Sequence, residues 1–264
     1  MKLILPSKIG MMDSGIGGFS VLNELLPVLP PEVLYVADAA HLPYGEKSVE
    51  FLFKRATAIT HFFEEHGITT IFVACHTLSA TVISTLQKEF PHIRYIDLLP
   101  LTVRHALMST KNNRIGVMAT PATITSHVHQ RLLITNNTLS SSSTITVVEQ
   151  ACPDFVHLIE RKASTAECMP AVTAYLSPLL VASVDTIILG CTHYPFLQNL
   201  LKKEAPQITF ISAANALPKF EKSKNTPSLH FVTTASVTYL EKAVDHFLRK
   251  DHNYILTLTS KQSL

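Results

Sequence analysis

Two cysteines, Cys75 and Cys191, each follow a run of apolar, β-favouring residues and are followed by polar side chains. The two stretches are residues 72–77 (FVACHT) and residues 187–193 (IILGCTH). An unperturbed thiol has a pKa of about 8.5, and a helix N-terminus or a protonated histidine lowers it. Two thiols on opposite sides of one carbon can remove a proton from one face and deliver a proton to the other. Such a pair inverts a stereocentre if both sulfur atoms reach the reacting carbon.

Other readings of these cysteines remain open at this point. A lone buried cysteine is commonly a small hydrophobic residue, and a single reactive one is typical of nucleophilic catalysis. Cys75-His76 and Cys191-Thr192-His193 contain the residue types of a metal site, but the CxxC or HxxxH spacing that supplies a tetrahedral site does not occur. We therefore expect no bound metal.

The other two cysteines, Cys152 and Cys168, do not stand at the end of an apolar run, so we interpret them as structural thiols. Four cysteines in 264 residues, none in a CxxC pair, are too sparse for a disulfide framework. The first ten residues lack the apolar core and small-residue cleavage site of a secretory signal. These features predict reduced thiols and a cytoplasmic location.

The composition is that of a globular protein with one or two domains, since 47% of the residues are hydrophobic and 16% are charged. The formal net charge is only +2, and no basic patch stands out, so we expect no nucleic-acid partner. No apolar run approaches the roughly 18 residues of a membrane span, so we also expect no membrane partner.

Short apolar runs alternate with longer amphipathic stretches, which predicts an α/β fold with mainly parallel sheets covered by helices on both faces. Predicted strands span residues 9–12, 33–37, 70–74, 93–97, 115–118, 144–148, 186–189 and 209–211. Predicted helices span residues 49–66, 79–90, 122–133, 169–181, 196–203 and 236–248. We expect Thr77 and Ser79 to cap the helix after Cys75. In such sheets functional side chains gather where strands end and helices begin.

The chain also shows an internal duplication. Residues 8–14 (KIGMMDS) resemble residues 114–120 (RIGVMAT), and the two cysteine stretches form a second pair at a similar offset. The polar tract 136–144 is the expected site of a loop insertion between the copies. We predict two similar doubly wound domains with the active site in the cleft between them. The first comprises residues 1–99 and 214–264 and carries Cys75, and the second comprises residues 100–213 and carries Cys191.

Several motifs together resemble glutamate racemases, which belong to the cofactor-independent aspartate/glutamate racemase superfamily. The motifs are residues 13–18 (DSGIGG), 38–45 (DAAHLPYG), 75–77 (CHT), 151–160 (ACPDFVHLIE) and 190–195 (GCTHYP). The resemblance implies interconversion of L- and D-glutamate without pyridoxal phosphate or another cofactor, and a supply of D-glutamate for peptidoglycan. It is compatible with a homodimer.

The resemblance also implies roles for individual residues. The paired acid and base would be Cys75 and Cys191, with Asp13 near the first thiol and His193 near the second. At the family level, Cys75 would act on D-glutamate and Cys191 on L-glutamate. Implied substrate-binding residues are Asp13, Ser14, Pro43, Tyr44, Gly45, His76, Thr77, Thr120, Thr123, Glu160, Thr192 and His193.

Some positions depart from the family pattern or leave a choice open. His76 stands where asparagine is usual, Leu78 replaces alanine, His41 replaces arginine and Ala119 replaces glycine. Glu149 competes with Glu160 for one carboxylate position. None of these changes removes a proposed acid or base, but they affect substrate fit and rate. Two alternatives therefore stay open, namely a racemase or epimerase of a related amino acid, and a catalytically weak amino-acid-binding or interaction protein.

Overall fold

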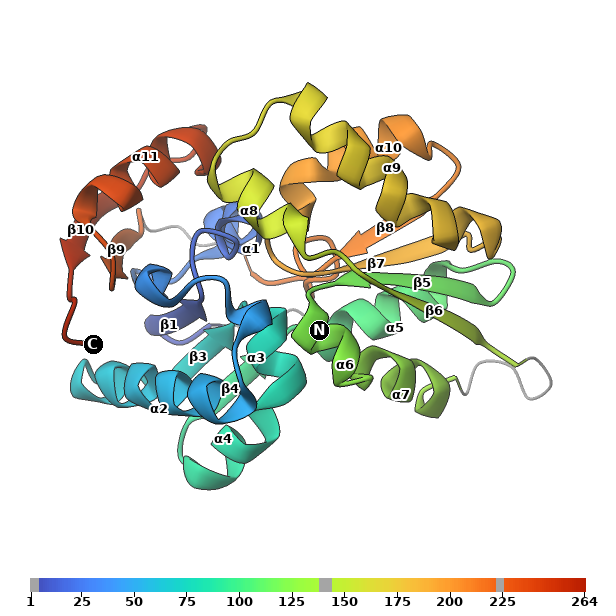
Figure 1. Ribbon diagram of the computed structural model, residues 1–264. Helices are drawn as coiled ribbons and strands as arrows, with labels where there is room; N and C mark the ends of the chain where they lie inside the picture. Colours follow the sequence, from blue (N-terminus) through green and yellow to red (C-terminus); the bar gives the residue numbers. More distant parts are fainter. Residues whose placement is uncertain (1–4, 138–143, 222–225) are drawn as a thin grey trace.

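The protein contains two parallel β-sheets with helices packed on both faces of each (Figure 1). This computed structural model describes residues 5–137, 144–221 and 226–264. The core of the predicted insertion, residues 138–143, lies outside the described residues, as do the first four residues of the chain. The predicted α/β class is confirmed.

The first sheet has six strands in the order β10-β9-β2-β1-β3-β4, and every neighbouring pair is parallel. Its strands are β1 (Lys8–Asp13), β2 (Glu32–Ala37), β3 (Thr70–Val73), β4 (Arg94–Asp97), β9 (Ser228–Thr233) and β10 (Ile255–Ser260). The second sheet has four parallel strands in the order β6-β5-β7-β8. Its strands are β5 (Arg114–Ala119), β6 (Thr146–Ala151), β7 (Thr186–Gly190) and β8 (Thr209–Ser212).

The two sheets share one topology, because β2-β1-β3-β4 and β6-β5-β7-β8 have the same order along the chain and in space. The equivalent strands β1 and β5 are those that contain the repeated sequence, and β3 and β7 are those that end at the cysteines. The prediction of two similar doubly wound halves is therefore confirmed.

Helices cover both faces of each sheet because successive residues of a buried strand point to opposite faces. Met11 belongs to the same hydrophobic cluster as Phe19 of α1 (Phe19–Leu25) on one face of β1, whereas Met12 belongs to another cluster with Leu52 of α2 (Val49–Glu65) on the other face. Figure 1 shows α2 and α4 on one side of the first sheet and α9 and α10 on one side of the second. The helices are α1 (Phe19–Leu25), α2 (Val49–Glu65), α3 (His76–Thr81), α4 (Ile83–Glu89), α5 (Leu99–Ser109), α6 (Pro121–Thr125), α7 (Val128–Thr135), α8 (Asp154–Glu160), α9 (Thr165–Val181), α10 (Gln198–Glu204) and α11 (Val237–Phe247).

The structure differs from the sequence predictions at several elements. Strands β9 and β10 were not predicted, and they extend the first sheet beyond β2. The helix predicted over residues 79–90 is divided into α3 and α4 at Val82. The predicted caps are wrong, since α3 begins at His76 directly after Cys75 and its N-cap makes no side-chain hydrogen bond. The helix predicted over residues 122–133 is likewise divided, because His127 adopts a left-handed conformation with φ of 50°.

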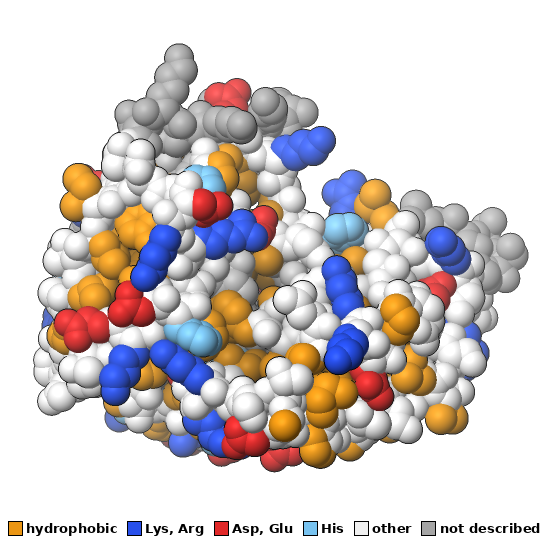
Figure 2. Space-filling view, turned by 90° about the horizontal axis from the view of Figure 1, so that it is seen from above, with side chains coloured by type: hydrophobic (Ala, Val, Ile, Leu, Met, Phe, Trp, Pro, Cys, Tyr) orange, Lys and Arg blue, Asp and Glu red, His pale blue; other side chains and the backbone are white. Residues whose placement is uncertain are grey.

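The first sheet takes all its strands from residues 8–97 and 228–260, and the second takes its strands from residues 114–212. The domain boundaries near residues 99 and 214 remain a prediction that agrees with this division. No helix in the described part of the chain is long and apolar enough to cross a membrane. On the face drawn in Figure 2, acidic side chains lie among the basic ones instead of leaving a patch of one charge.

Candidate active site

The central strands of both sheets end at one small cavity between the two halves of the molecule. Both Cys75, after β3, and Cys191, after β7, line it. The space that remains is about 10 Å³, which is room for roughly one water molecule. The lining consists of Ser14, Pro43, Tyr44, Gly45, Cys75, His76, Thr77, Thr120, Val156, Cys191, Thr192 and His193. The lining does not include three of the predicted site residues, Asp13, Thr123 and Glu160.

Cys75 lies against the first turn of α3, where the backbone amides of Thr77 and Leu78 act on its sulfur atom. Burial raises the pKa of the Cys75 thiol far above its ordinary value, and the nearby Asp13 carboxylate adds to the rise. The two amides and their helix oppose this effect without cancelling it. The neutral thiol is therefore the favoured form of Cys75 at pH 7. Cys191 also contributes to the shift, so the two thiols are close enough to interact.

A chain of three side chains runs outward from the second thiol. The Sγ atom of Cys191 is 3.9 Å from Nδ1 of His193, whose Nε2 is 2.7 Å from Oε1 of Glu160 on α8. Burial lowers the pKa of His193, but its hydrogen bonds to Cys191 and Glu160 outweigh that effect and raise the pKa well above the ordinary value. His193 is thus held as an imidazolium that can exchange a proton with Cys191.

The structure decides which carboxylate stands beside His193. Glu160 bonds to His193 and accepts a further hydrogen bond from the hydroxyl of Tyr239 at 3.1 Å. Glu149, the competing candidate, lies on β6 and bonds instead to Nδ1 of His127 at 2.7 Å. Glu160 therefore lies behind His193, where it orients the imidazole ring.

Asp13 connects the two halves of the site. Its Oδ2 accepts a hydrogen bond from Thr192 Oγ1 at 2.9 Å, and its Oδ1 accepts one from the backbone N–H of Gly15 at 3.1 Å. Burial raises the pKa of Asp13, although His193 and these two donors oppose the rise. The nearby Gly17 must be a glycine, because a Cβ atom there would lie 2.4 Å from both His193 Nδ1 and Thr192 Oγ1.

Three buried threonine hydroxyls from both halves bond to one another. Thr77 Oγ1 lies 3.0 Å from Thr120 Oγ1, which lies 3.0 Å from Thr123 Oγ1. Hydroxyl groups rotate freely, so each can redirect its proton from a neighbouring threonine to a bound carboxylate. Without a ligand, the three satisfy one another inside the protein interior.

His76 forms one wall of the cavity and stacks against His129 of α7, with ring centroids 6.1 Å apart. None of the four ring nitrogens has a hydrogen-bond partner among the described residues, and both side chains are buried. Burial lowers the pKa of His76 to about 4 and that of His129 to about 3, with His76 contributing to the latter. Both rings are therefore neutral at pH 7. His129 belongs to no motif of the sequence, and Val156 lies in the motif of residues 151–160 but was not predicted to line the site.

Comparison with known proteins places this geometry in a family. The profile described as Asp/Glu/Hydantoin racemase matches residues 9–219. The chain belongs to this family. It is 39% identical over 214 residues to a glutamate racemase of Pseudomonas syringae pv. tomato, covering 80% of this chain and 76% of that one. It is 38% identical over 216 residues to a glutamate racemase of Aliarcobacter butzleri, covering 80% and 81%.

Solved structures of family members have the same two-domain fold. The glutamate racemase RacE1 of Bacillus anthracis superposes with a TM-score of 0.82 at 30% identity, covering 95% of this chain and 96% of that one. The glutamate racemase of Francisella tularensis, solved in complex with D-glutamate, gives a TM-score of 0.82 at 28% identity, covering 97% and 98%. Because it belongs to this family, the chain is an amino-acid racemase. Among the described residues, no three His, Cys, Asp or Glu side chains are grouped as metal ligands.

The histidine pair predicts a loss of stability in acid. Because the native pKa of His76 is about 4, the unfolded chain, with an ordinary value of about 6.5, binds more protons between these two pH values. The free energy of unfolding should therefore fall as the pH drops below about 6.5, and the contribution of His76 should level off below about 4. At pH 5 we expect His76 to account for a loss of about 1–2 kcal/mol relative to pH 7.

Urea unfolding at pH 7 and pH 5 checks this expectation. His76→Asn, which cannot titrate, should lose less stability between the two pH values than the wild type. His61→Asn is the matched control, since the His61 side chain is 61% exposed. An equal pH dependence in the wild type and His76→Asn would contradict the assignment of a buried neutral imidazole.

Proposed function

We propose that the chain is a glutamate racemase that interconverts L- and D-glutamate with two thiols as the acid and the base. The observation that carries the proposal is that Cys75 and Cys191, at the ends of the equivalent strands β3 and β7, line one cavity. The choice of glutamate is supported by the names of the relatives and by the D-glutamate bound to the Francisella enzyme.

In this proposal, one thiolate takes the α-proton of the substrate and becomes a thiol, while the opposite thiol gives its proton to the other face and becomes a thiolate. Charge and protons balance in this step, which leaves the protonation states of the two thiols exchanged. The ammonium group of the substrate favours the thiolate form of Cys75, and the proton released by this thiol passes to Asp13, the carboxylate whose charge acts on it. His193, held by Glu160, exchanges the proton of Cys191. We keep the family-level prediction that Cys75 acts on D-glutamate and Cys191 on L-glutamate.

Substrate binding is proposed for the polar groups around the cavity. The hydroxyls of Thr77 and Thr120 line the cavity and are near enough to each other to share a carboxylate, and Thr123 bonds to Thr120 behind them. Ser14, Thr192 and the Pro43–Gly45 segment complete the wall. A cavity of about 10 Å³ is too small for a whole amino acid, so the two halves must separate to admit glutamate. On closing, the site excludes water, which strengthens the hydrogen bonds that stabilise the developing carbanion.

We propose that His76 contacts the substrate, because its unpartnered ring lines the cavity and offers one donor and one acceptor when neutral. A neutral imidazole thereby supplies a hydrogen-bond donor and a hydrogen-bond acceptor, as the amide of asparagine does. From the family resemblance we further propose a cytoplasmic enzyme without pyridoxal phosphate that supplies D-glutamate for peptidoglycan. A homodimer stays a prediction.

The crowding around Cys75 favours a second candidate, an amino-acid-binding protein with weak catalysis. Leu78 is fully buried there, and His76 occupies the wall of a cavity that has almost no free volume. If the pocket stays this small, a bound amino acid is held in too distorted a pose for both thiols to reach its α-carbon. The two candidates differ in a measurable property, exchange of the α-hydrogen.

Incubation of the purified chain with L-glutamate in D₂O decides between them. We expect the α-proton NMR signal of glutamate to disappear while D-glutamate accumulates, without added pyridoxal phosphate. Aspartate and larger diamino acids, tested in parallel, measure the breadth of the substrate class. Exchange on one of these and none on glutamate would redirect the proposal to a related racemase, and no exchange on any of them would leave the binding protein.

A further inference from the structure

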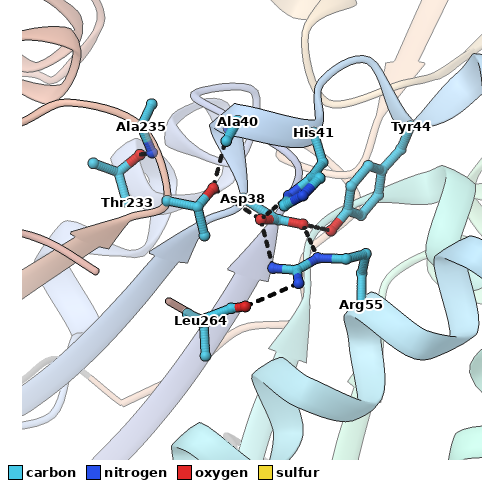
Figure 3. Close-up of polar contacts among 9 residues, drawn as sticks. Asp38, Ala40, His41, Tyr44, Arg55, Thr233, Ala235 and Leu264 are labelled. Atoms are coloured by element: carbon cyan, nitrogen blue, oxygen red, sulfur yellow. Dashed lines mark hydrogen bonds and ion pairs between the residues drawn. The ribbon is translucent and has the colours of Figure 1, made fainter. Parts of the chain in front are cut away.

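A buried network behind the cavity holds the segment Pro43–Gly45 in place. At its centre is Asp38, which directly follows β2 and has no exposed side-chain surface (Figure 3). Arg55 of α2 binds it through two bonds, from Nε to Oδ2 at 2.8 Å and from Nη2 to Oδ1 at 2.9 Å. The Arg55 side chain is itself only 12% exposed. Such a planar two-bond pairing fixes the carboxylate in one orientation.

Further donors converge on the same carboxylate. His41 Nδ1 lies 2.8 Å from Oδ1, and the hydroxyl of Tyr44 donates to Oδ2 (Figure 3). Thr234 Oγ1 also donates to Oδ1, at 2.8 Å. Burial alone would raise the pKa of Asp38, but the bonds from Arg55, Tyr44 and His41 outweigh it and hold the pKa below its usual range. Asp38 is thus an ionised acceptor whose lone pairs are occupied, which leaves it no proton to donate to a substrate.

The network connects the cavity to parts of the chain that are distant in sequence. Tyr44 lines the cavity while its hydroxyl is engaged with Asp38. Thr234, which follows β9, also accepts a hydrogen bond from the backbone N–H of Ala40 at 3.0 Å. Arg55 donates from Nη1 to the backbone carbonyl of Leu264 at 2.9 Å (Figure 3).

The position of the Pro43–Gly45 segment is critical because this segment contacts the second half of the molecule beside the cavity. A Cβ atom on Gly45 would lie 2.5 Å from the Cβ of Thr120, so the backbone of the segment closely approaches the threonine cluster. A small movement of the segment would therefore change the shape of the cavity. A displacement of about 1 Å from a remote residue can reduce catalysis about a hundredfold.

We propose that Arg55 is a positioning residue of the racemase, which acts through Asp38 and Tyr44 to hold the Pro43–Gly45 segment against the substrate. The kinetic part of this inference rests on the proposed function. Arg55 touches neither the cavity nor the thiols, so its loss should weaken binding of both enantiomers equally. That signature differs from the loss of one thiol, which affects the two directions differently.

The test compares Arg55→Lys and Arg55→Met with the wild type. Lysine keeps the charge but cannot form the planar pair of bonds. We expect KM to rise about ten- to a hundredfold for both L- and D-glutamate, with a smaller fall in kcat and with Arg55→Met the more severe. Arg114→Lys is the matched control. Arg114, the first residue of β5, is also a partly buried arginine, and it donates a hydrogen bond to the backbone carbonyl of Ala182 away from the cavity.

A second measurement reads the network without relying on catalysis. The chain is labelled with 3-fluorotyrosine, and the ¹⁹F resonance of Tyr44 is assigned through Tyr44→Phe. This resonance should shift in both Arg55 variants and stay in place in Arg114→Lys. An unmoved Tyr44 resonance, or a moved one accompanied by an unchanged KM for both enantiomers, would overturn the proposal. A wild type that does not racemise glutamate would refute the proposed function, whereas the Tyr44 resonance would still decide whether Arg55 positions the segment.

Discussion

Cys75→Ala and Cys191→Ala should each abolish racemisation of glutamate, lowering kcat about 10³-fold or more. Each variant lacks either the base or the acid of the inversion. The remaining thiol can still take a proton from one enantiomer and return a deuteron to the same face. In D₂O we therefore expect Cys75→Ala to label L-glutamate and Cys191→Ala to label D-glutamate, each without inversion, as measured by NMR and chiral chromatography.

Cys168→Ala provides the matched control for these variants. Cys168 is a buried thiol on α9 that does not line the cavity, so its loss should leave the racemase rate unchanged. Racemisation at the wild-type rate by either cysteine variant would refute the two-thiol mechanism. Labelling of the opposite enantiomers would keep the mechanism and reverse the assignment of the thiols.

His193→Asn should reduce the rate starting from L-glutamate about 10²- to 10³-fold, because Cys191 then lacks its proton-exchange partner. Glu160→Gln should have a smaller effect of the same kind, since it keeps the size of the side chain and removes the charge that helps raise the pKa of His193. Without that charge the His193 pKa falls, so the limb of the pH–rate profile that reports His193 should move to lower pH. Initial rates from each enantiomer across the pH range measure both effects.

Glu64→Gln is the control for the loss of a histidine-bound carboxylate. Glu64 bonds to His61 and His92 on the surface, at the end of α2. We expect it to retain the wild-type rate and pH profile. If Glu160→Gln behaved in the same way, the charge of Glu160 would have no influence on the reaction.

The amino-acid sequence determined much of this protein by local pattern. Fully apolar runs that alternate with amphipathic ones are typical of parallel strands covered by helices on both faces. In that arrangement the strands pair their backbone hydrogen-bonding groups and the helices bury the apolar side chains. The duplication then placed Cys75 and Cys191 at equivalent strand ends, and carboxyl ends of parallel strands collect functional groups. The local pattern therefore predicted the fold class, the similarity of the two halves and the two cysteines, whereas most of the other residues that line the cavity were implied by the family resemblance.

The tertiary structure decided what no local pattern encodes. Glu160 and Glu149 are both plausible carboxylates in sequence, and only the packing of α8 against the cavity brings Glu160 within 2.7 Å of His193. The contact between His76 and His129 likewise joins two helices from different halves.

The network around Asp38 depends most strongly on the tertiary fold. Strands β9 and β10 have no clear pattern in the sequence, and Arg55 belongs to a helix, α2, that amphipathic periodicity alone predicts. The structure joins this helix to Asp38, Thr234 and Leu264 across almost the whole length of the chain. Periodicity reports which face of an element is buried, whereas the partner of a buried charge is set by desolvation and geometry once the elements have packed together.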